Sequence, residues 1–294
     1  LAELSRLAIE RLAPQLPTPP QALLLALPAR LADEQGRLDD AGRAAVGVLR
    51  RQLPRGWDQL AIEVFPQGAP AAAWALRRAL QRLPRDGVLL WGCVDTLHDA
   101  GVLTELEGGD RLLRPDQVDG MRPGEAAAFV ALGARAVEGA VGLLACGFGD
   151  DETAADEVTL DAALTASLTG ALAPLRALGA RCNQWLLGSS HEEVATRALQ
   201  NLIGRCGDVL GTATLLHAPL KELGHVGAAT LPLLFALAAE AWRDGHHAEP
   251  FAVLVDGLYR GGERAAAALV LQAPDRPSRS PALSAGAGSP AWMR

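Results

Sequence analysis

The residues of this chain that could carry out chemistry are few and far apart. Three cysteines, Cys93, Cys146 and Cys182, lie in apolar runs typical of buried strands, where a thiol is far more often inert packing than a nucleophile. The fourth, Cys206, shares no metal-ligand spacing with them. The stretch Ser189-Ser190-His191 holds the atoms of a serine–histidine pair. Residues adjacent in sequence seldom face each other in the geometry that such a pair needs.

One segment has the local pattern of a reactive site without a reactive residue. A short β-branched run, 61–65, ends at Pro66-Gln67-Gly68, and an alanine-rich helical pattern follows at once. Such a junction presents its turn beside free backbone N–H groups and the positive end of a helix, where proteins often place a nucleophile or an anion. Neither Phe65 nor the two residues after it is a nucleophile, and a phenylalanine here is more commonly core packing.

Composition narrows the class of protein. The 294 residues carry a net charge of −7 and no stripe of clustered lysine and arginine, which argues against a nucleic-acid binder. The apolar stretches are broken well before the roughly 20 residues that a membrane span needs. No cofactor or metal motif is present, so none is expected, and a reduced, cytoplasmic compartment is the default.

Apolar periodicity and proline positions predict the elements that hold these residues. The first half is predicted to contain helix 1–12, strand 22–27, helix 37–53, strand 59–65, helix 69–83, strand 87–94 and strand 124–132. The second half is predicted to contain strand 140–148, helix 159–178, strand 182–187, helix 191–203, strand 212–216, helix 225–243 and strands 251–255 and 264–271.

The predicted order indicates an α/β protein built by duplication. Alternating strands and helices favour a sheet covered by helices. The second half reads βαβαβαββ, and the first half has the same order without its first strand. We therefore expect two packed halves, 1–132 and 133–272, and a flexible tail, 273–294, rich in proline, serine, alanine and glycine. The sequence starts with leucine, which leaves open whether the strand was lost or lies outside these residues.

Three motifs together resemble one enzyme family, the β-ketoacyl synthases. Residues 118–132 (VDGMRPGEAAAFVAL) resemble its DGF-x-x-GEGAG segment, and residues 223–230 (LGHVGAAT) resemble its GH-x-x-GAAG segment. Residues 90–95 (LWGCVD) are similar to the strand end that precedes the first of these. The resemblance implies a thiolase-like fold, with duplicated βαβαβαββ halves in a five-layer αβαβα arrangement.

In these enzymes a cysteine at a helix N-terminus takes up the acyl group as a thioester, and two histidines, or a histidine and an asparagine, support decarboxylation and hold the oxyanion. Matching the family's C-A/S-S-G turn to this chain puts Gly68 at its glycine and Phe65 where the cysteine would be. The resemblance therefore implies a degenerate nucleophile position at Phe65. It leaves Gln67 and Gly68 as expected substrate contacts.

The family's second histidine falls on His225, the only member of the triad that is retained. His225 could instead cap the turn before an apolar helix. The flanking Gly224 and Gly227 are expected to contact substrate. The loop that should hold the first histidine contains only His191, a few residues late, and Lys221 resembles the family's nearby lysine and is expected to be structural.

Two further features have structural interpretations. Glu125 is expected to be a buried carboxylate with hydrogen-bond partners that braces the two halves, because burying it demands partners. His246 and His247 follow a predicted helix end at Gly245 and have the pattern of a solvated cap.

Three functions stay open. The first is a ketosynthase-like protein without condensing activity, which binds acyl chains or a partner subunit in fatty-acid or polyketide-type metabolism, with an acyl-carrier protein or acyl-CoA as partner. The second is an acyltransferase or decarboxylase that uses His225 on thioesters without a covalent step. The third is an interaction scaffold, which predicts no pocket between the Phe65 turn and His225. By resemblance, strand 59–64 is expected to form the seam of a homodimer or heterodimer.

Overall fold

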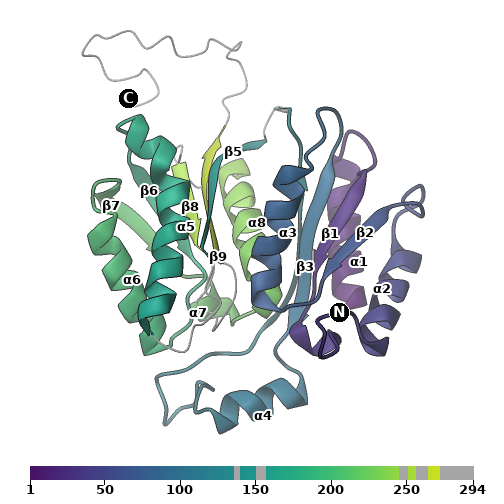
Figure 1. The fold of residues 1–294 in the computed structure, drawn as a ribbon, viewed down its shortest axis with the longest axis horizontal. Coiled ribbons are helices and arrows are strands. Elements are labelled where there is room, and N and C mark those ends of the chain that lie inside the picture. The colour runs from purple at the N-terminus through teal and green to yellow at the C-terminus, as the bar shows by residue number, and fades with distance from the viewer. Residues whose placement is uncertain (136–139, 150–156, 245–250, 256–263, 272–294) are drawn as a thin grey trace.

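The computed structural model describes residues 1–135, 140–149, 157–244, 251–255 and 264–271. These residues form two mixed sheets with helices between and outside them (Figure 1). The expected tail, 273–294, and the expected cap at His246 and His247 lie outside the described residues. Among the described helices, none combines the length and the apolar character that crossing a membrane requires.

The N-terminal sheet has the strand order β2-β1-β3-β4. Its strands are β1 (Ala22–Ala26), β2 (Ala61–Phe65), β3 (Leu89–Thr96) and β4 (Glu125–Leu132). The first three run parallel, and β4 runs antiparallel to β3. The wholly apolar sequence ALLLA of β1 suits its central place, because a strand covered on both faces has no side that prefers water.

The C-terminal sheet repeats this arrangement and adds one strand. Its strands are β5 (Val141–Gly149), β6 (Cys182–Leu187), β7 (Leu210–His217), β8 (Phe251–Val255) and β9 (Arg264–Leu271). Its strand order, read from the β7 edge, is β7-β6-β8-β9-β5. The first four strands match the N-terminal order β2-β1-β3-β4, with β6 to β9 corresponding to β1 to β4. Strand β5, which pairs antiparallel with β9, has no counterpart in the described N-terminal sheet. The expected duplication, and the place of the strand that the first half lacks, are therefore both visible.

Helices lie outside and between the sheets (Figure 1). The α-helices are α1 (Ala2–Leu12), α2 (Asp40–Gln52), α3 (Ala69–Gln81), α4 (Ala100–Gly108), α5 (Glu157–Ala177), α6 (Glu193–Arg205), α7 (Leu220–Leu223) and α8 (Thr230–Arg243). The short 3-10 helices are η1 (Ala13–Gln15), η2 (Ala29–Leu31) and η3 (Gly227–Ala229). Helices α1 and α2 cover the N-terminal sheet, α5 and α6 cover the C-terminal sheet, and α3 and α8 lie between the two (Figure 1).

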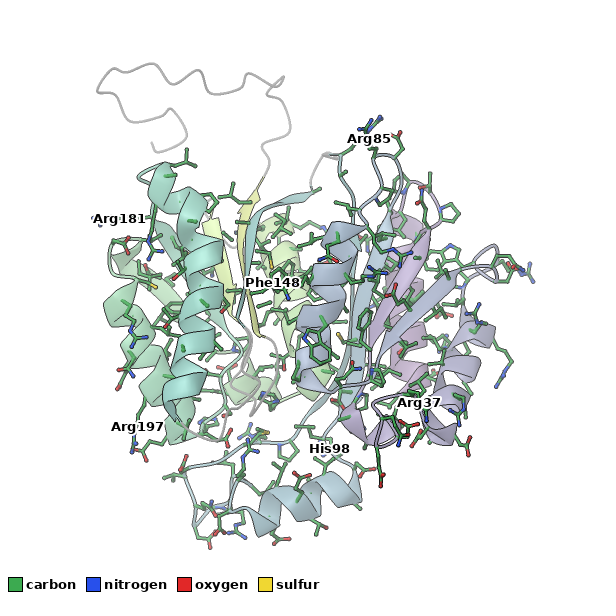
Figure 2. The ribbon with its side chains drawn as sticks, in the orientation of Figure 1. Arg37, Arg85, His98, Phe148, Arg181 and Arg197 are labelled. Atoms are coloured by element: carbon green, nitrogen blue, oxygen red, sulfur yellow. The ribbon has the colours of Figure 1, made fainter. Side chains whose placement is uncertain are left out.

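The central helices are packed tightly. Helix α3 buries a face of alanines, which lets it fit between two sheets. The indole Nε1–H of Trp91 in β3 donates to the Ala72 carbonyl at 3.1 Å, and its ring meets the Phe235 ring of α8 edge to face at 5.0 Å. The guanidinium of Arg77 in α3 lies 5.0 Å from the ring centre of Phe148 in β5, which Figure 2 shows in the space between the halves. These contacts join the N-terminal and C-terminal sheets through α3.

Two expectations need correction. Glu125 is exposed, not buried: it is the first residue of β4, paired with Thr96 at the far end of β3, and so lies at the end of the sheet. The predicted helix 225–243 begins only at Thr230, because Gly224 and Gly227 have positive φ angles of 90° and 53° that no α-helix accommodates.

Candidate functional site

His225 lies in the loop between α7 and η3 and is only 2% exposed. Its backbone N–H donates to the Arg122 carbonyl at 2.7 Å, and the Gly124 N–H donates to the His225 carbonyl at 2.9 Å. These bonds form a short parallel bridge between Pro123 and His225. The two longest motifs of the sequence are thus joined backbone to backbone.

A backbone donor fixes the protonation of the His225 ring. The N–H of Gly227 donates to His225 Nδ1 at 3.2 Å. Because that nitrogen accepts, the neutral imidazole carries its proton on Nε2. A buried histidine in this tautomer can donate an Nε2–H hydrogen bond to a carbonyl oxygen or an oxyanion.

Asp95, at the end of β3, holds the turn that follows His225. The residue is 3% exposed. Its Oδ2 accepts the Ala228 N–H at 2.9 Å, and its Oδ1 accepts the Thr96 N–H at 2.8 Å and Arg30 Nη1 at 3.1 Å. Burial raises the pKa of Asp95, while the Ala228 amide and the Arg30 guanidinium oppose that rise. In the sequence, Asp95 was only the last residue of the motif at 90–95. Its role in anchoring the turn is seen from its hydrogen bond to the Ala228 amide.

Both motif glycines beside His225 are required by the backbone. A Cβ on Gly227 would lie 2.1 Å from Asp95 Oδ2, and a Cβ on Gly224 would lie 2.7 Å from the Pro123 carbonyl oxygen. Their positive φ angles disfavour other residues as well. The backbone geometry alone accounts for glycine at both positions, so no bound ligand is needed to explain them. Their expected contact with substrate stays a prediction.

A carboxylate that sequence reasoning missed, Glu192, completes this side of the site. Its Oε1 accepts Arg111 Nε at 2.7 Å, and its Oε2 accepts the Ser190 hydroxyl at 2.8 Å. Burial alone would raise the pKa of Glu192, but the hydrogen bonds from Arg111 and Ser190 and the charge of Arg111 outweigh it and hold that pKa below the ordinary value. The available signal was a glutamate at the start of a predicted helix, where it sits as the N-cap residue of α6.

The serine–histidine pair considered from the sequence does not form. Ser190 bonds to Glu192, whereas His191 Nε2 lies 3.1 Å from the Lys221 carbonyl oxygen. The Ser189 hydroxyl is buried and makes no hydrogen bond to any described residue. Lys221 thus contacts the site loop through its backbone, in α7 just before His225.

The strand–turn–helix segment has its predicted strand end and helix start, with β2 ending at Phe65 and α3 beginning at Ala69. Phe65 is the last residue of β2, opposite Ala26, and packs against the central core. The residue at the mouth of α3 is the N-cap Gly68, with φ 72° and ψ −143°, and its N–H donates to the Leu27 carbonyl at 3.0 Å. The packing of Phe65 agrees with its interpretation as a core residue, and its match to the family's nucleophile position stays a prediction.

The residue types around the turn can be read directly from the sequence. Residues 65–71 read FPQGAPA, and none of their side chains has a nucleophilic atom. The Gln67 Oε1 atom is buried at this turn and accepts no hydrogen bond from a described residue. Ala228 and Ala229 of η3 share the central core with the alanines of α3, so the His225 turn packs directly on this helix.

The four cysteines lie elsewhere in the fold, mostly in its core. Cys93, Cys182 and Cys206 are buried and Cys146 is half-buried, as expected for core residues. The Cys182 Sγ lies 2.8 Å from the Gln184 carbonyl oxygen, and burial raises the pKa of Cys206. Within the described ranges, no three histidine, cysteine or acidic side chains are grouped as metal ligands would be.

Solved structures with this arrangement are numerous, although no protein-family model and no curated sequence matches the chain. One is ChlB3, described as an acyltransferase, at 17% identity over 93% of this chain and 84% of that one, with a TM-score of 0.63. Another is the ishigamide ketosynthase/chain length factor, at 18% identity over 86% and 74%, with a TM-score of 0.58. A third is 3-oxoacyl-(acyl carrier protein) synthase III of Pseudomonas aeruginosa PAO1, at 17% identity over 94% and 84%, with a TM-score of 0.57.

These similarities identify the fold. The thiolase-like α/β class expected from the motifs is confirmed, since the similar structures are ketosynthase-type proteins of that fold. At identities below 20% the likeness extends to the fold alone.

Proposed function

We propose that this thiolase-like protein is a ketosynthase-like subunit without condensing activity, which binds acyl chains or a ketosynthase-type partner in fatty-acid or polyketide-type metabolism. One observation carries the proposal. The junction of β2 and α3 keeps its sharp turn at Gly68, yet residues 65–71 offer no atom that could form an acyl thioester. The His225 loop, with its fixed tautomer, is retained beside it.

The similar structures support the choice of metabolism. One is of a ketosynthase/chain length factor, and another is of a 3-oxoacyl-(acyl carrier protein) synthase. An acyl-carrier protein or an acyl-CoA is accordingly the partner we propose. Gln67, whose buried Oε1 has no described hydrogen-bond partner, is the polar group at the α3 turn that such a ligand could engage.

Dimerisation through β2 is part of the same proposal. Strand β2 lies at the edge of its sheet, as predicted, and Ala61 at its start is exposed. An exposed edge strand is a ready template for pairing with another chain. Sedimentation at micromolar concentration should give a dimer of this chain alone, or a heterodimer when a ketosynthase is added. A monomer both alone and with the ketosynthase would contradict this part of the proposal.

Intact mass measurement tests the loss of condensing activity. The protein is incubated with hexanoyl-CoA, malonyl-CoA and hexanoyl-acyl-carrier protein, with an active cysteine-containing ketosynthase as positive control. We expect acylation of the control and an unchanged mass for this chain. A stable adduct on this chain would overturn the proposal, and peptide mapping would then identify the residue that carries the acyl group.

A second candidate rests on His225. Its buried ring, with the Nε2–H tautomer and the Glu192 carboxylate nearby, could polarise a thioester carbonyl and promote decarboxylation without a covalent step. This candidate predicts release of carbon dioxide from malonyl-CoA, lost in His225→Ala and kept in a control in which the exposed His98 is replaced by alanine. If the wild-type rate equals the uncatalysed rate, the second candidate fails and the first stands.

A further inference from the structure

Residues 98–121, between β3 and β4, form an excursion outside the two sheets, which we call the strap. Its two ends are held together, because the Leu97 N–H donates to the Gly124 carbonyl at 2.9 Å. Helix α4 of the strap lies below the layers in Figure 1 and is not packed closely on any other described helix or strand. The strap is therefore attached to the N-terminal sheet mainly at its base.

The strap has a small apolar core of its own. Buried Leu106 and Met121 form a cluster with Leu97 at the base, separate from the larger clusters of the protein. The Met121 N–H donates to the Arg111 carbonyl at 2.6 Å, and the Leu113 N–H donates to the Met121 carbonyl at 3.0 Å. These bonds join the two arms of the strap, so it can move as one unit.

Far from its base, the strap is tied to the C-terminal half by two polar contacts at the start of α6. Arg111 holds the Glu192 carboxylate through Nε at 2.7 Å and Nη2 at 3.3 Å. Beside this ion pair, the Glu193 N–H donates to Asp119 Oδ1 at 2.6 Å. Among the described residues, no apolar cluster spans the strap and α6. Regions with few buried apolar contacts open at the lowest cost, so these ties are the part of the strap most easily released.

The tied end of the strap contacts the loop that leads to the His225 site. The Glu192 carboxylate accepts the Ser190 hydroxyl, and His191 Nε2 lies 3.1 Å from the Lys221 carbonyl oxygen. The second contact joins this loop to α7, which directly precedes His225 in the chain. Ser190 is 5% exposed and His225 is 2% exposed. Both are closed to solvent while the strap is tied.

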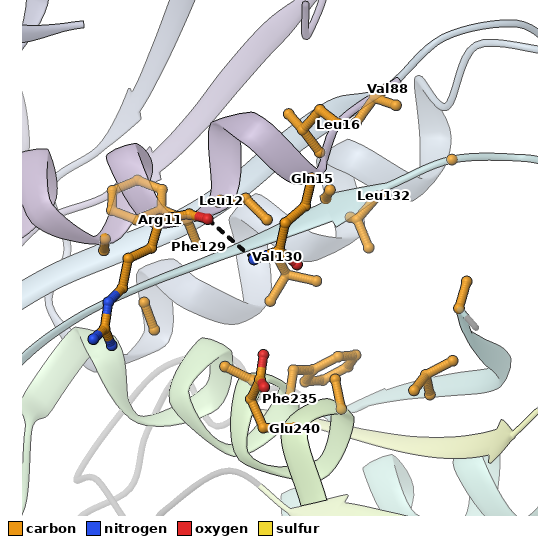
Figure 3. A pocket seen from close by; sticks show the side chains of 18 of the residues that line it. Arg11, Leu12, Gln15, Leu16, Val88, Phe129, Val130, Leu132, Phe235 and Glu240 are labelled. Carbon is orange, nitrogen blue, oxygen red and sulfur yellow. Dashed lines mark hydrogen bonds between the residues drawn. The ribbon is translucent and has the colours of Figure 1, made fainter. Parts of the chain in front are cut away.

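The large cavity beside β4 offers no route to these groups. It has a volume of about 1570 Å³ and lies between α1, β4 and α8 (Figure 3). Its lining includes Leu12, Val130 and Phe235, but no residue of the strap and none of the buried groups around His225. Access to His225 therefore needs a movement elsewhere in the structure.

We propose that the strap is a gate to the His225 site. It swings away from α6 when the Arg111–Glu192 ion pair and the Asp119 contact break together, while its base at Leu97 stays closed. Movement of a segment about a few residues at its ends is a common way to admit a ligand to a buried site. That the ligand is an acyl thioester rests on the proposed function, whereas the movement itself does not.

Hydrogen exchange measures the movement. Arg111→Met breaks the ion pair and keeps a long side chain. Arg114→Met is the matched control, because the ion pairs of Arg114 lie within the strap. We expect the Glu193 amide to exchange about tenfold faster in the first variant than in the unsubstituted protein, with the Leu97 amide unchanged. The control should leave both rates as they are.

Chemical labelling tests whether this movement opens the site. Diethyl pyrocarbonate modifies accessible histidines, and peptide mapping gives the rate at His225 relative to the exposed His98. Arg111→Met and Asp119→Ala each remove one of the two ties. Each should raise the His225 rate several-fold and leave the His98 rate unchanged.

Three results would overturn the proposal. One is a His225 rate that is unchanged in both variants, and another is an equal effect of Arg114→Met. The third is equal acceleration of the Leu97 and Glu193 amides in Arg111→Met, which would mean that the whole structure loosens and no gate opens. Failure of the unsubstituted protein to bind hexanoyl-CoA would count against the proposed function alone, because neither measurement on the strap uses an acyl ligand.

Discussion

The Oδ2 atom of Asp95 accepts a hydrogen bond of 2.9 Å from the Ala228 backbone N–H, across 133 residues of sequence. This bond fixes the end of β3 to the turn that carries His225. The same turn supplies the Gly227 N–H that sets the His225 tautomer. The position and protonation of His225 thus depend on a carboxylate in the other half of the chain.

Replacing Asp95 with alanine should destabilise the protein by about 3 kcal/mol, because a buried amide and an arginine lose their partner. Urea unfolding measures the loss, and hydrogen exchange of the Ala228 amide should become faster. The control is Asp86→Ala, which removes the ion pair between the exposed Asp86 and Arg135 and should change little. An equal effect of the two substitutions would show that Asp95 does not anchor the turn.

Replacing Gly227 with alanine should cost several times more than the same change at Gly36. Both residues have positive φ, 53° and 71°, so both variants bear the same backbone strain of about 1 kcal/mol. At Gly227 the new Cβ would also lie 2.1 Å from Asp95 Oδ2, whereas nothing lies within 4 Å of it at Gly36. The difference in unfolding free energy between the two variants isolates the contact. Similar losses would mean that the turn can move away from Asp95.

Glu192 should make stability depend on acidic pH. Its pKa is lower in the folded state, so its contribution is present above the unfolded value of about 4.3 and disappears as pH falls through the folded value. Glu192→Gln should therefore cost about 2 kcal/mol at pH 7 and progressively less toward pH 3. Urea unfolding at several pH values measures this difference.

The neighbouring residue provides the control for that experiment. Glu193 pairs with Arg197 on the exposed face of α6. Glu193→Gln should have a small effect that varies little with pH. A Glu192→Gln penalty that stays constant from pH 7 to pH 3 would contradict the lowered pKa.

The sequence predicted strands and helices best where the residue pattern of a single segment determines its secondary structure. The strands at 182–187, 251–255 and 264–271 were predicted with their observed bounds. The last two are almost wholly apolar runs, which have few alternatives in a sheet covered on both faces. Helix α4 was missed, since Ala100–Gly108 has glycine at both ends and only Leu106 buried, which gives no apolar stripe. Glu125 was misplaced because one sequence does not say which end of a strand faces solvent.

The site was only partly predictable, because local motifs can be read from the sequence and long-range contacts cannot. His225 was found because its motif is local. The Arg111–Glu192 contact spans 81 residues and joins the segment between β3 and β4 to the loop after β6. Contacts of this kind follow from how the halves pack, and periodicity within one segment carries no information about them. Phe65 was predicted as the last residue of strand 59–65, and the observed β2 ends at the same residue.

A cysteine placed in the α3 turn should be reactive if the turn keeps the electrostatics of a nucleophile site. Gln67→Cys puts a thiol just before the N-cap Gly68, where the positive end of α3 should lower its pKa below the ordinary value of about 8.5. Gln52→Cys is the matched control. Gln52 is also half-buried with an unpartnered Oε1, but it is the last residue of α2, where the negative helix end disfavours a thiolate.

Alkylation by iodoacetamide at pH 7 then compares the two thiols, with the unsubstituted protein as the baseline for the four native cysteines. We expect Gln67→Cys to react about tenfold faster than Gln52→Cys, which corresponds to a pKa difference near one unit. Incubation with hexanoyl-CoA should acylate only the first variant. Equal alkylation rates would show that the turn at Gly68 does not favour a negative charge.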